Sequence, residues 1–320
     1  MVSMLLAGLS VFSVARSEPV HIPELLEPGA GVLGMASCTE KSELYANSDR
    51  RYSLQSVVKL LVGMAMYDAQ DRGILRLSDK VTVTTKDRSA GYQPLEDEVT
   101  HGRSFTTTWR DLVARAVQES DSMACDILID KLGGPSKVQD FLHRKGVTGI
   151  HVNRYERELQ SDTAGLQWRP EYVDAKKYEN ALQRLTKADR DRAHAKYRND
   201  PRDTATPRAL CLLLKKLATG TLLKPESCTD LMEIMEGTVT YPDRLSDGIP
   251  KGWKFGHKTG SSGTWNGLAV ATNDIGIARH PDGKYVVLVA LLADSRLTMD
   301  KRNAILQSFA RRNPLFNEDR

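Results

Sequence analysis

A serine and a lysine three residues apart are the first pair in this sequence that could do chemistry. Ser56 and Lys59 form the only Ser-x-x-Lys in the chain and lie where an apolar helix is predicted to begin. This spacing puts the ammonium about one turn beyond the hydroxyl on the same helix face. A lysine desolvated in a pocket can take the proton of a serine and make it a nucleophile. The pair therefore indicates nucleophilic catalysis, although a helix cap and a solvated lysine would look the same.

Two further short segments place polar groups at the ends of predicted elements. Ser120–Ser122 (Ser-Asp-Ser) precedes an apolar helix, where N-capping alone would explain it. Lys258–Gly260 is the only Lys-Thr-Gly, lies on a predicted strand and is followed by small residues. A strand edge with an ammonium, hydroxyls and no bulky side chains can lie alongside a carboxylate-bearing substrate. A strand end that leads into a turn is the alternative.

In this order and on these elements, the three segments resemble the motif set of penicillin-recognising serine enzymes. From about Val32 to Ala310 the sequence is similar to class A serine β-lactamases. Residues 256–260 and 273–277 are close to the PER- and VEB-type subgroup. The resemblance implies an α+β fold in which a five-stranded antiparallel sheet is flanked by helices and joined to an all-helical lobe.

The resemblance also extends to the omega loop, which in this family carries the deacylating glutamate. Residues 154–160 match that segment and place the glutamate at Glu156, and residues 203–207 match the end of the loop. By resemblance, Arg154 and Asp203 would form an ion pair across the neck of the loop.

The resemblance implies a two-step acyl transfer without a metal or other cofactor. Ser56 would attack the lactam carbonyl and give its proton to Lys59, or through water to Glu156. Glu156 would then activate the water that hydrolyses the acyl-enzyme. The remaining roles carried over are proton transfer to the leaving nitrogen by Ser120 with Lys258, an oxyanion hole from the backbone N–H groups of Ser56 and Ser261, and substrate contacts by Tyr92, Ser122, Gln160, Thr259, Gly260, Ser261 and Arg244.

Arg244 is the expected cation for a substrate carboxylate. The family often has an arginine on the strand after Lys-Thr-Gly, but this chain has Asn266 there, and some members use an arginine before that strand instead. A bidentate arginine suits a carboxylate better than a lone lysine. The alternatives are a surface position for Arg244 and a loop-packing aromatic for Tyr92.

Three features depart from the family pattern. Ser122 replaces the usual asparagine, which weakens the expected grip on substrate amides, and Asp126 stands where most members have asparagine. Between Gln160 and Asp203 the chain carries an insertion of roughly thirty residues, well beyond common connection lengths. We expect a helical excursion at the rim of the cleft, with one solvent-facing helix over Ala175–Tyr197, that widens or covers the site.

Deletion of residues 165–196 should therefore change the range of β-lactams hydrolysed more than the stability of the fold. The measurement is steady-state kinetics on penicillins and cephalosporins beside thermal unfolding. Unchanged kinetics on both substrate groups would contradict the expectation.

The elements that must position these residues are strands at both ends of the chain and helices between them. Apolar patterns predict a hairpin at 31–46, strands at 254–258, 266–272 and 285–293, and helices at 56–71, 108–117, 121–132, 136–145, 206–219, 225–236 and 298–310. The two ends must meet in one antiparallel sheet, with a cleft between that sheet and the helices. We expect an α/β lobe from 18–54 and 237–320, and a helical lobe from 55–236 that contains an extended omega loop at 152–203.

Composition excludes several classes of protein. The net charge of +4 comes from 45 basic and 41 acidic residues that are scattered along the 320-residue chain, so nucleic acid is not an expected partner. The seven histidines and four cysteines show no zinc-ligand spacing. Cys125 lies in an apolar helical pattern and is expected to be a buried free thiol, whereas pairing of the four cysteines stays open. A monomer without stable membrane association is expected.

Residues 1–17 are predicted to be a signal peptide. Residues 1–15 are apolar, too short to span a bilayer, and end in Ser-Val-Ala, which suits a signal peptidase, although a basic start is missing. A periplasmic or secreted location follows from this interpretation. A frayed apolar tail is the alternative.

Two other functions compete with β-lactam hydrolysis. A penicillin-binding D,D-peptidase or transpeptidase would share the nucleophile but lack a deacylating glutamate, so Glu156 argues against it. A non-catalytic penicillin-sensing module would not need Ser56, Lys59, Glu156 and Lys258 together. Steady hydrolysis, as opposed to a burst followed by a stall, separates the enzyme from the peptidase.

Overall fold

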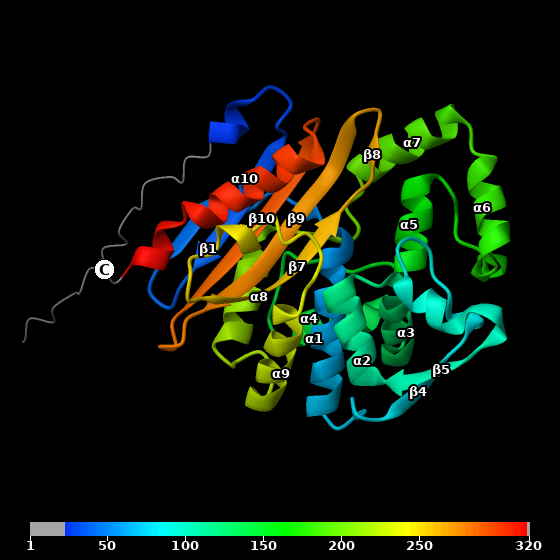
Figure 1. Cartoon of the computed structure of the whole chain (residues 1–320), viewed down its shortest axis with the longest axis horizontal. Coiled ribbons are helices and arrows are strands. Elements are labelled where there is room, and N and C mark those ends of the chain that lie inside the picture. The colour runs from blue at the N-terminus through cyan, green and yellow to red at the C-terminus, as the bar shows by residue number, and fades with distance from the viewer. Residues whose placement is uncertain (1–22, 319–320) are drawn as a thin grey trace, which may run out of the picture.

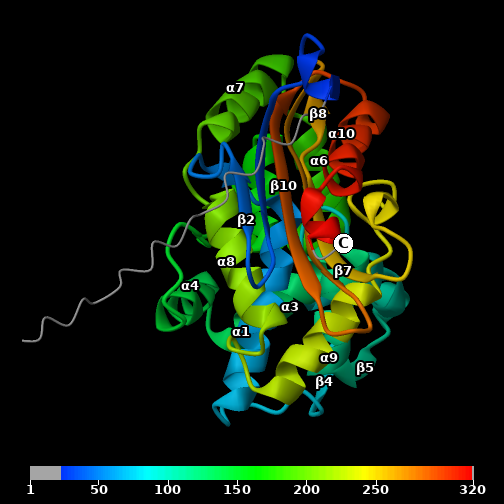
Figure 2. The ribbon, with the colours of Figure 1, turned by 90° about the vertical axis from the view of Figure 1, so that its left-hand side faces the viewer.

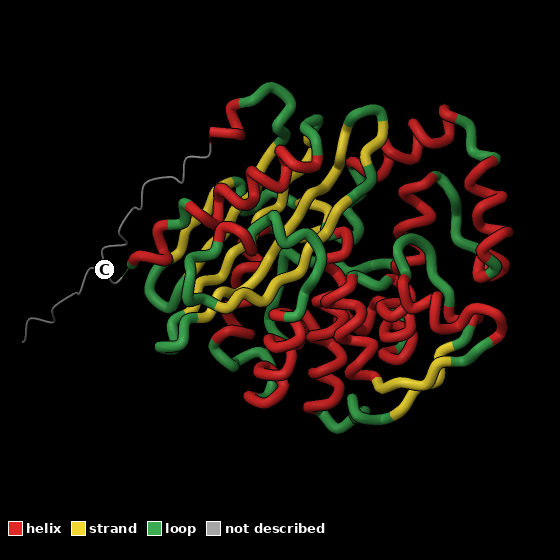
Figure 3. Tube along the Cα trace, viewed as in Figure 1, coloured by secondary structure: helices red, strands yellow, loops and turns green. Residues whose placement is uncertain are grey.

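A twisted antiparallel sheet forms the centre of the computed structural model, which describes residues 23–318 (Figures 1 and 3). Within these residues its strand order is β2-β1-β10-β9-β7, and the two-residue β8 adds a sixth strand by pairing with β9. The first and last thirds of the chain thus meet, as predicted, because β1 pairs with β10 along its whole length. The strands are β1 Val32–Cys38, β2 Glu43–Ala46, β3 Tyr52–Ser53, β4 Lys80–Val83, β5 Phe105–Thr108, β6 Thr204–Ala205, β7 Lys254–Ser261, β8 Thr264–Trp265, β9 Leu268–Arg279 and β10 Tyr285–Ser295.

Both faces of the sheet are buried, which explains why β10 reads as one continuous apolar run. Side chains of a strand alternate between faces. Val287, Val289 and Leu291 pack in the cluster that contains the helical body, and Leu288 and Leu292 pack against α10 on the other face. Figure 2 shows α8 and α10 on opposite sides of the sheet.

The helical body is built around α1, which is buried on all sides. A helix that is apolar all round belongs in a core, and every residue of α1 from Val58 to Ala69 is buried. The helices are α1 Val58–Asp71, α2 Trp109–Ala114, α3 Ser122–Leu132, α4 Pro135–Arg144, α5 Glu156–Ala164, α6 Ala175–Gln183, α7 Lys187–Arg198, α8 Pro207–Ala218, α9 Pro225–Glu236 and α10 Met299–Arg311.

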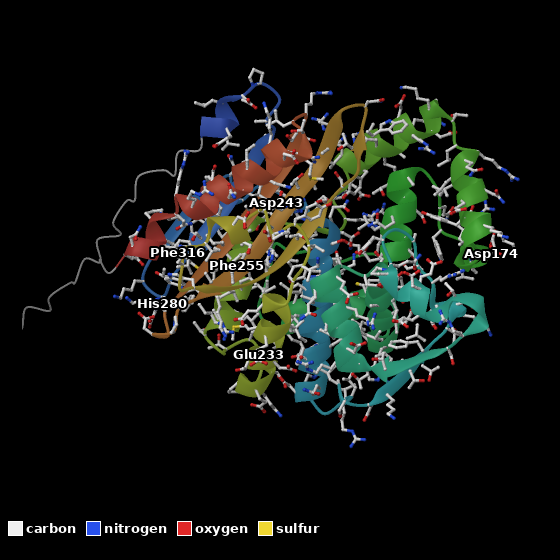
Figure 4. The ribbon with its side chains drawn as sticks, viewed as in Figure 1. Asp174, Glu233, Asp243, Phe255, His280 and Phe316 are labelled. Atoms are coloured by element: carbon white, nitrogen blue, oxygen red, sulfur yellow. The ribbon has the colours of Figure 1, made fainter. Side chains whose placement is uncertain are left out.

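The inserted segment departs from the prediction of one helix over Ala175–Tyr197. It forms two helices, α6 and α7, because Thr186 caps a new helix by accepting a hydrogen bond from the backbone N–H of Asp189. Figure 4 shows Asp174, the N-cap of α6, at the outer edge of the molecule, whereas Phe255 lies on the sheet, and His280 and Phe316 lie toward its far end. The insertion is therefore a helical excursion, as expected, but a bent one.

One small ribbon was not predicted from the sequence, and one predicted strand needs correction. β4 and β5 pair with each other as a two-stranded ribbon. The strand predicted at 266–272 begins at Leu268 and continues to Arg279, so residues 273–277 lie within β9. Cys125 is a buried free thiol, as predicted. The predicted signal peptide lies outside the described residues.

The contact between α10 and the sheet generates a stability prediction. Phe309 is buried in the cluster that α10 forms with the sheet, so we expect Phe309→Ala to lower the free energy of unfolding by about 3–5 kcal/mol. Leu212→Ala, at a leucine that is 43% exposed on α8, should change it by only about 0.5 kcal/mol. Urea denaturation measures both, and equal effects would contradict this assignment of the core.

Candidate active site

Ser56 lies at the start of the buried helix α1, on a short 3-10 turn over Gln55–Val57. Gln55, immediately before it, has a left-handed backbone (φ 48°), which turns the chain sharply into the helix. Lys59 follows one turn later, and its Nζ donates a hydrogen bond of 2.9 Å to Ser56 Oγ. The predicted pairing of hydroxyl and amine is confirmed.

Glu156 completes a chain of three groups with Ser56 and Lys59. Its Oε2 lies 2.9 Å from Lys59 Nζ, and both side chains are almost completely buried. Burial alone would raise the pKa of the Glu156 carboxyl, but the nearby Lys59 ammonium outweighs burial and holds the pKa below its usual value. The site thus holds an ionised carboxylate close to the nucleophile.

Asp126 fixes the position of Glu156. Its carboxylate accepts hydrogen bonds from the backbone N–H groups of Glu156 (2.7 Å) and Arg157 (3.0 Å), and from Ser89 Oγ (2.7 Å). Asp126 thereby accepts from the first turn of α5, where N–H groups have no partner within the helix. The aspartate that departs from the family pattern therefore anchors the helix that carries the glutamate.

The neck of the inserted loop is closed by the ion pair expected from the resemblance. Arg154 Nε donates to Asp203 Oδ2 at 2.6 Å, and both side chains are buried. Arg154 also contacts Asp162 and Asp200. The pair joins the two ends of the segment on which Glu156 lies.

Ser120 and Lys258 form a second pair of functional groups. Ser120 has a left-handed backbone (φ 64°) after the π-turn at Arg115–Glu119, and Asp121 caps α3 directly after it. Lys258 Nζ donates to Ser120 Oγ at 3.0 Å and to the carbonyl of Thr259 at 2.9 Å. Burial, aided by the nearby Lys59 ammonium, lowers the pKa of Lys258 to about 7.

Strand β7 lies directly against the turn that carries Ser56. A Cβ on Gly260 would lie 2.7 Å from the carbonyl oxygen of Leu54 and 3.2 Å from the backbone nitrogen of Ser56. Asn273 ties the same turn to the sheet by donating to the carbonyls of Ser53 and Leu54. Only glycine permits this approach, which brings the backbone of Ser56 next to β7, as an oxyanion hole shared with Ser261 would require.

Arg244 lies beneath β7 rather than on the surface of the cleft. It is completely buried, and its guanidinium donates to Asn303 Oδ1, to the carbonyl of Asn273 and to Ser261 Oγ. Burial lowers the pKa of Arg244 to about 10. Neither the expected direct contact with a substrate nor the surface alternative fits this position, because Ser261 stands between the guanidinium and the cleft.

These groups surround a cleft of about 370 Å³ between the helices and β7. Its lining contains, of the predicted residues, Ser56, Tyr92, Ser120, Ser122, Gln160, Thr259, Gly260 and Ser261. Lys59, Glu156 and Lys258 lie beneath this lining and contact it through Ser56, Ser122, Gln160 and Ser120. Tyr92 is 65% exposed, which fits the predicted aromatic at the mouth.

Three residues at the site were not predicted. Thr240 and Tyr241 line the cleft, and Thr240 Oγ1 lies 2.6 Å from Thr259 Oγ1. Tyr197, at the end of α7, contacts Ser53 Oγ, and its hydroxyl oxygen accepts a hydrogen bond from Gln55 Nε2. No local pattern marks these residues, because each depends on a contact between distant segments.

The arrangement is suited to acyl transfer. It offers a hydroxyl nucleophile, an amine and a carboxylate that can move its proton, and a second amine beside a second hydroxyl. Residues 23–318 contain no group of three or more His, Cys, Asp or Glu side chains that could hold a metal ion.

Comparison with known proteins decides the family. A sequence profile described as "Beta-lactamase enzyme family" matches residues 22–313. The chain belongs to this family. It is 28% identical over 308 residues to beta-lactamase VEB-1 of Pseudomonas aeruginosa, covering 94% of this chain and 91% of that protein. It is 26% identical over 314 residues to the extended-spectrum beta-lactamase PER-1 of the same organism, covering 96% and 91%.

Solved beta-lactamase structures agree with this membership. A beta-lactamase from Chitinophaga pinensis is 26% identical, with a TM-score of 0.71 over 90% of this chain and 93% of that chain. The TLA-1 extended-spectrum beta-lactamase is 25% identical, with a TM-score of 0.72 over 91% and 94%. The α+β fold and the class A resemblance predicted from the sequence are confirmed.

The close approach of β7 generates a prediction for this beta-lactamase fold. Gly260→Ala should push β7 away from Ser56, because the new methyl group would meet backbone atoms that cannot move aside. We expect the rate of benzylpenicillin hydrolysis to fall about 100-fold while circular dichroism shows a folded protein. Gly263→Ala, where nothing lies within 4 Å of the added Cβ, is the matched control. Equal rates for the two variants would argue against the predicted geometry.

Proposed function

We propose that this protein hydrolyses β-lactam antibiotics through an acyl-enzyme on Ser56. The observation that carries the proposal is the buried chain Ser56–Lys59–Glu156, in which Lys59 Nζ lies 2.9 Å from both oxygens. Membership of the beta-lactamase family and the β-lactamases among its relatives support the same activity.

Acylation begins with transfer of the Ser56 proton. Lys59 donates to both oxygens, so its ammonium must give a proton to Glu156 before the amine can accept one from Ser56; transfer through a water to Glu156 is the second route. The Ser56 Oγ–carbonyl bond then forms and the lactam C–N bond breaks. Ser120, hydrogen-bonded to Lys258, gives its proton to the leaving nitrogen, and the proton taken from Ser56 replaces it. Lys59 and Glu156 thereby return to the ammonium and the carboxylate before deacylation.

Deacylation requires a base that reaches a water beside the ester. Glu156 Oε2 accepts from Lys59, Ser122 and Gln160, whereas the buried Oε1 accepts from none of the described side chains. That oxygen is available to take a proton from a hydrolytic water. A D,D-peptidase has no need for such a carboxylate, which favours hydrolysis over a stable penicilloyl adduct or a sensing role.

Substrate binding falls to the walls of the cleft. Thr259 and Ser261 line one side, and the Lys258 ammonium lies directly beneath it, bonded to Ser120 and to the carbonyl of Thr259. Together these groups suit the carboxylate of a β-lactam. Arg244 acts as a positioning residue, since it holds Ser261 Oγ at 2.6 Å. On the other side, Ser122 contacts Glu156 at 3.3 Å, so a substrate amide meets a short hydroxyl there instead of an asparagine.

The setting of the enzyme is proposed from the sequence. The proposed export to the periplasm or medium rests on residues 1–17. Composition and charge are the basis for proposing a monomer without a nucleic-acid partner. The proposed boundaries of the two lobes follow the predicted elements. In the described part of the chain, no helix has the length and apolar character needed to cross a membrane.

Substitution of the nucleophile and the carboxylate tests the mechanism. With a chromogenic cephalosporin, Ser56→Ala should be inert because nothing can form the ester. Glu156→Ala should acylate but deacylate slowly, so that mass spectrometry of the quenched reaction shows the covalent adduct. Glu179→Ala, at an exposed glutamate on α6, should behave as wild type. Rapid turnover by Glu156→Ala, or hydrolysis by Ser56→Ala, would refute these roles.

The lowered pKa of Lys258 generates a pH prediction. A lysine loses its charge as the pH rises through its pKa, which is about 7 here, so its attraction for a substrate carboxylate weakens above that pH. We expect kcat/KM to decline on the alkaline side of about pH 7, and Lys258→Arg to move this decline above about pH 9, because a guanidinium stays charged. A wild-type profile that is flat between about pH 6 and 9 would contradict it.

A further inference from the structure

Another hollow, of about 430 Å³, lies beside the cleft, and the inserted helices form part of its wall. We call it the side chamber. Its lining includes Thr163 of α5, Tyr178 of α6, Arg190 and His194 of α7, and Trp265 of β8. It shares Gln160 with the cleft, and Ser261 and Ser262, which are consecutive on the chain, line the cleft and the chamber respectively. The two hollows are therefore neighbours across Gln160.

The wall of the side chamber is tied to the sheet. Asp191 on α7 accepts hydrogen bonds from Trp265 Nε1 (2.7 Å) and Asn266 Nδ2 (2.8 Å) at the β8–β9 turn. Tyr197, at the other end of α7, contacts Gln55 beside the nucleophile. These contacts hold α7 across the space between α5 and β8. The wall that the insertion gives to the chamber is therefore fixed by specific hydrogen bonds.

The lining of the side chamber carries one positive charge, that of Arg190. The imidazole of His194 lies in the same lining, and no Asp or Glu does. Within residues 23–318, the guanidinium of Arg190 makes one hydrogen bond, to the carbonyl of Leu182 at 3.2 Å, and no ion pair. His194 Nε2 is buried without a hydrogen-bond partner among the described residues. The Tyr178 hydroxyl accepts a hydrogen bond from Ser161, so its own proton can be donated to an anion beside Arg190.

We propose that the side chamber binds the acylamino side chain of β-lactams in which that side chain carries a carboxylate, with Arg190 as the residue that selects it. The inference rests on the proposed function, since it requires a β-lactam at Ser56 whose side chain extends past Gln160, the residue that lines both hollows. The volume accommodates a bulky substituent, and a guanidinium without a carboxylate partner recognises the substituent's charge.

The test compares two cephalosporins that share one nucleus and one oxyimino side chain, which ends in a carboxylate in one and in its methyl ester in the other. Arg190→Gln should lower kcat/KM for the carboxylate about tenfold, the effect of one charge-assisted hydrogen bond, and leave the ester within about twofold. Arg192→Gln is the matched control, because Arg192 lies on the same helix, is exposed and pairs with Asp189.

The possible outcomes distinguish failure of the chamber proposal from failure of the proposed function. An Arg190→Gln enzyme that hydrolyses both compounds in the wild-type ratio overturns the chamber proposal alone. An equal loss on both compounds also overturns it, because Arg190 would then be structural. Failure of the wild-type protein to hydrolyse either compound or benzylpenicillin overturns the proposed function itself.

A separate observation concerns two cysteines that do not line the cleft. Cys38 of β1 and Cys211 of α8 are completely buried, and their sulfur atoms lie 3.1 Å apart. They are separated by 173 positions in the sequence and join the sheet to the helix that packs on it. The other two cysteines, Cys125 and Cys228, have no sulfur partner within the described residues.

We infer that Cys38 and Cys211 form a disulfide when the chain folds in the presence of a disulfide oxidant. The two thiols lose two protons and two electrons, and the oxidant's disulfide is reduced to two thiols by exchange. A bond that closes so long a loop constrains the unfolded chain and stabilises the fold.

Refolding the full chain with oxidised or reduced glutathione tests this inference. After denaturation and alkylation, intact mass should show two modified thiols in the oxidised sample and four in the reduced one, and peptide mapping should link Cys38 to Cys211. Reduction should lower the Tm of the wild type and of Cys125→Ser, but not that of Cys38→Ser. Four alkylated thiols after oxidative refolding, or a linkage that involves Cys125 or Cys228, would overturn it.

Discussion

A buried ammonium held between a hydroxyl and a carboxylate is the constraint on which this structure depends. Lys59 and Glu156 are almost completely removed from water, yet their charged atoms lie 2.9 Å apart. Removing one partner of such a pair leaves an uncompensated buried charge, which costs about 3–5 kcal/mol. The fold must therefore place Glu156 accurately next to Lys59, although the two lie 97 positions apart in the sequence. Asp126 and the Arg154–Asp203 pair hold Glu156 in that place.

The contacts that position Glu156 and its loop come from three different parts of the chain. Asp126 on α3 covers the N–H groups at the start of α5, Arg154 and Asp203 close the loop neck, and Tyr197 links the insertion to the turn before the nucleophile. Because the loop is closed at its neck, the roughly thirty inserted residues need not disturb Glu156. Loop-closure cost grows slowly with length, so an excursion of this size is compatible with an intact site.

Much of this could be predicted from sequence, since several of the signals are local. The spacing of Ser56 and Lys59 and the apolar period of α1 required no tertiary information, and the resemblance located Glu156. The break between α6 and α7 is also marked locally, by the capping box of Thr186 and Asp189. By contrast, the contacts of Tyr197 and the burial of Arg244 depend on how distant segments pack, and no periodic pattern reports that.

The charge balance of the cleft links substrate binding to protonation. Lys59 has a carboxylate partner, but Lys258 is bonded only to a hydroxyl and a carbonyl within the described residues. Its ammonium is therefore destabilised by burial and by Lys59, which is why the pKa of Lys258 falls to about 7. A substrate carboxylate placed beside it would supply the missing negative charge and raise that pKa again. Substrate binding and protonation of Lys258 must then favour each other, so that binding of the substrate promotes proton uptake by Lys258.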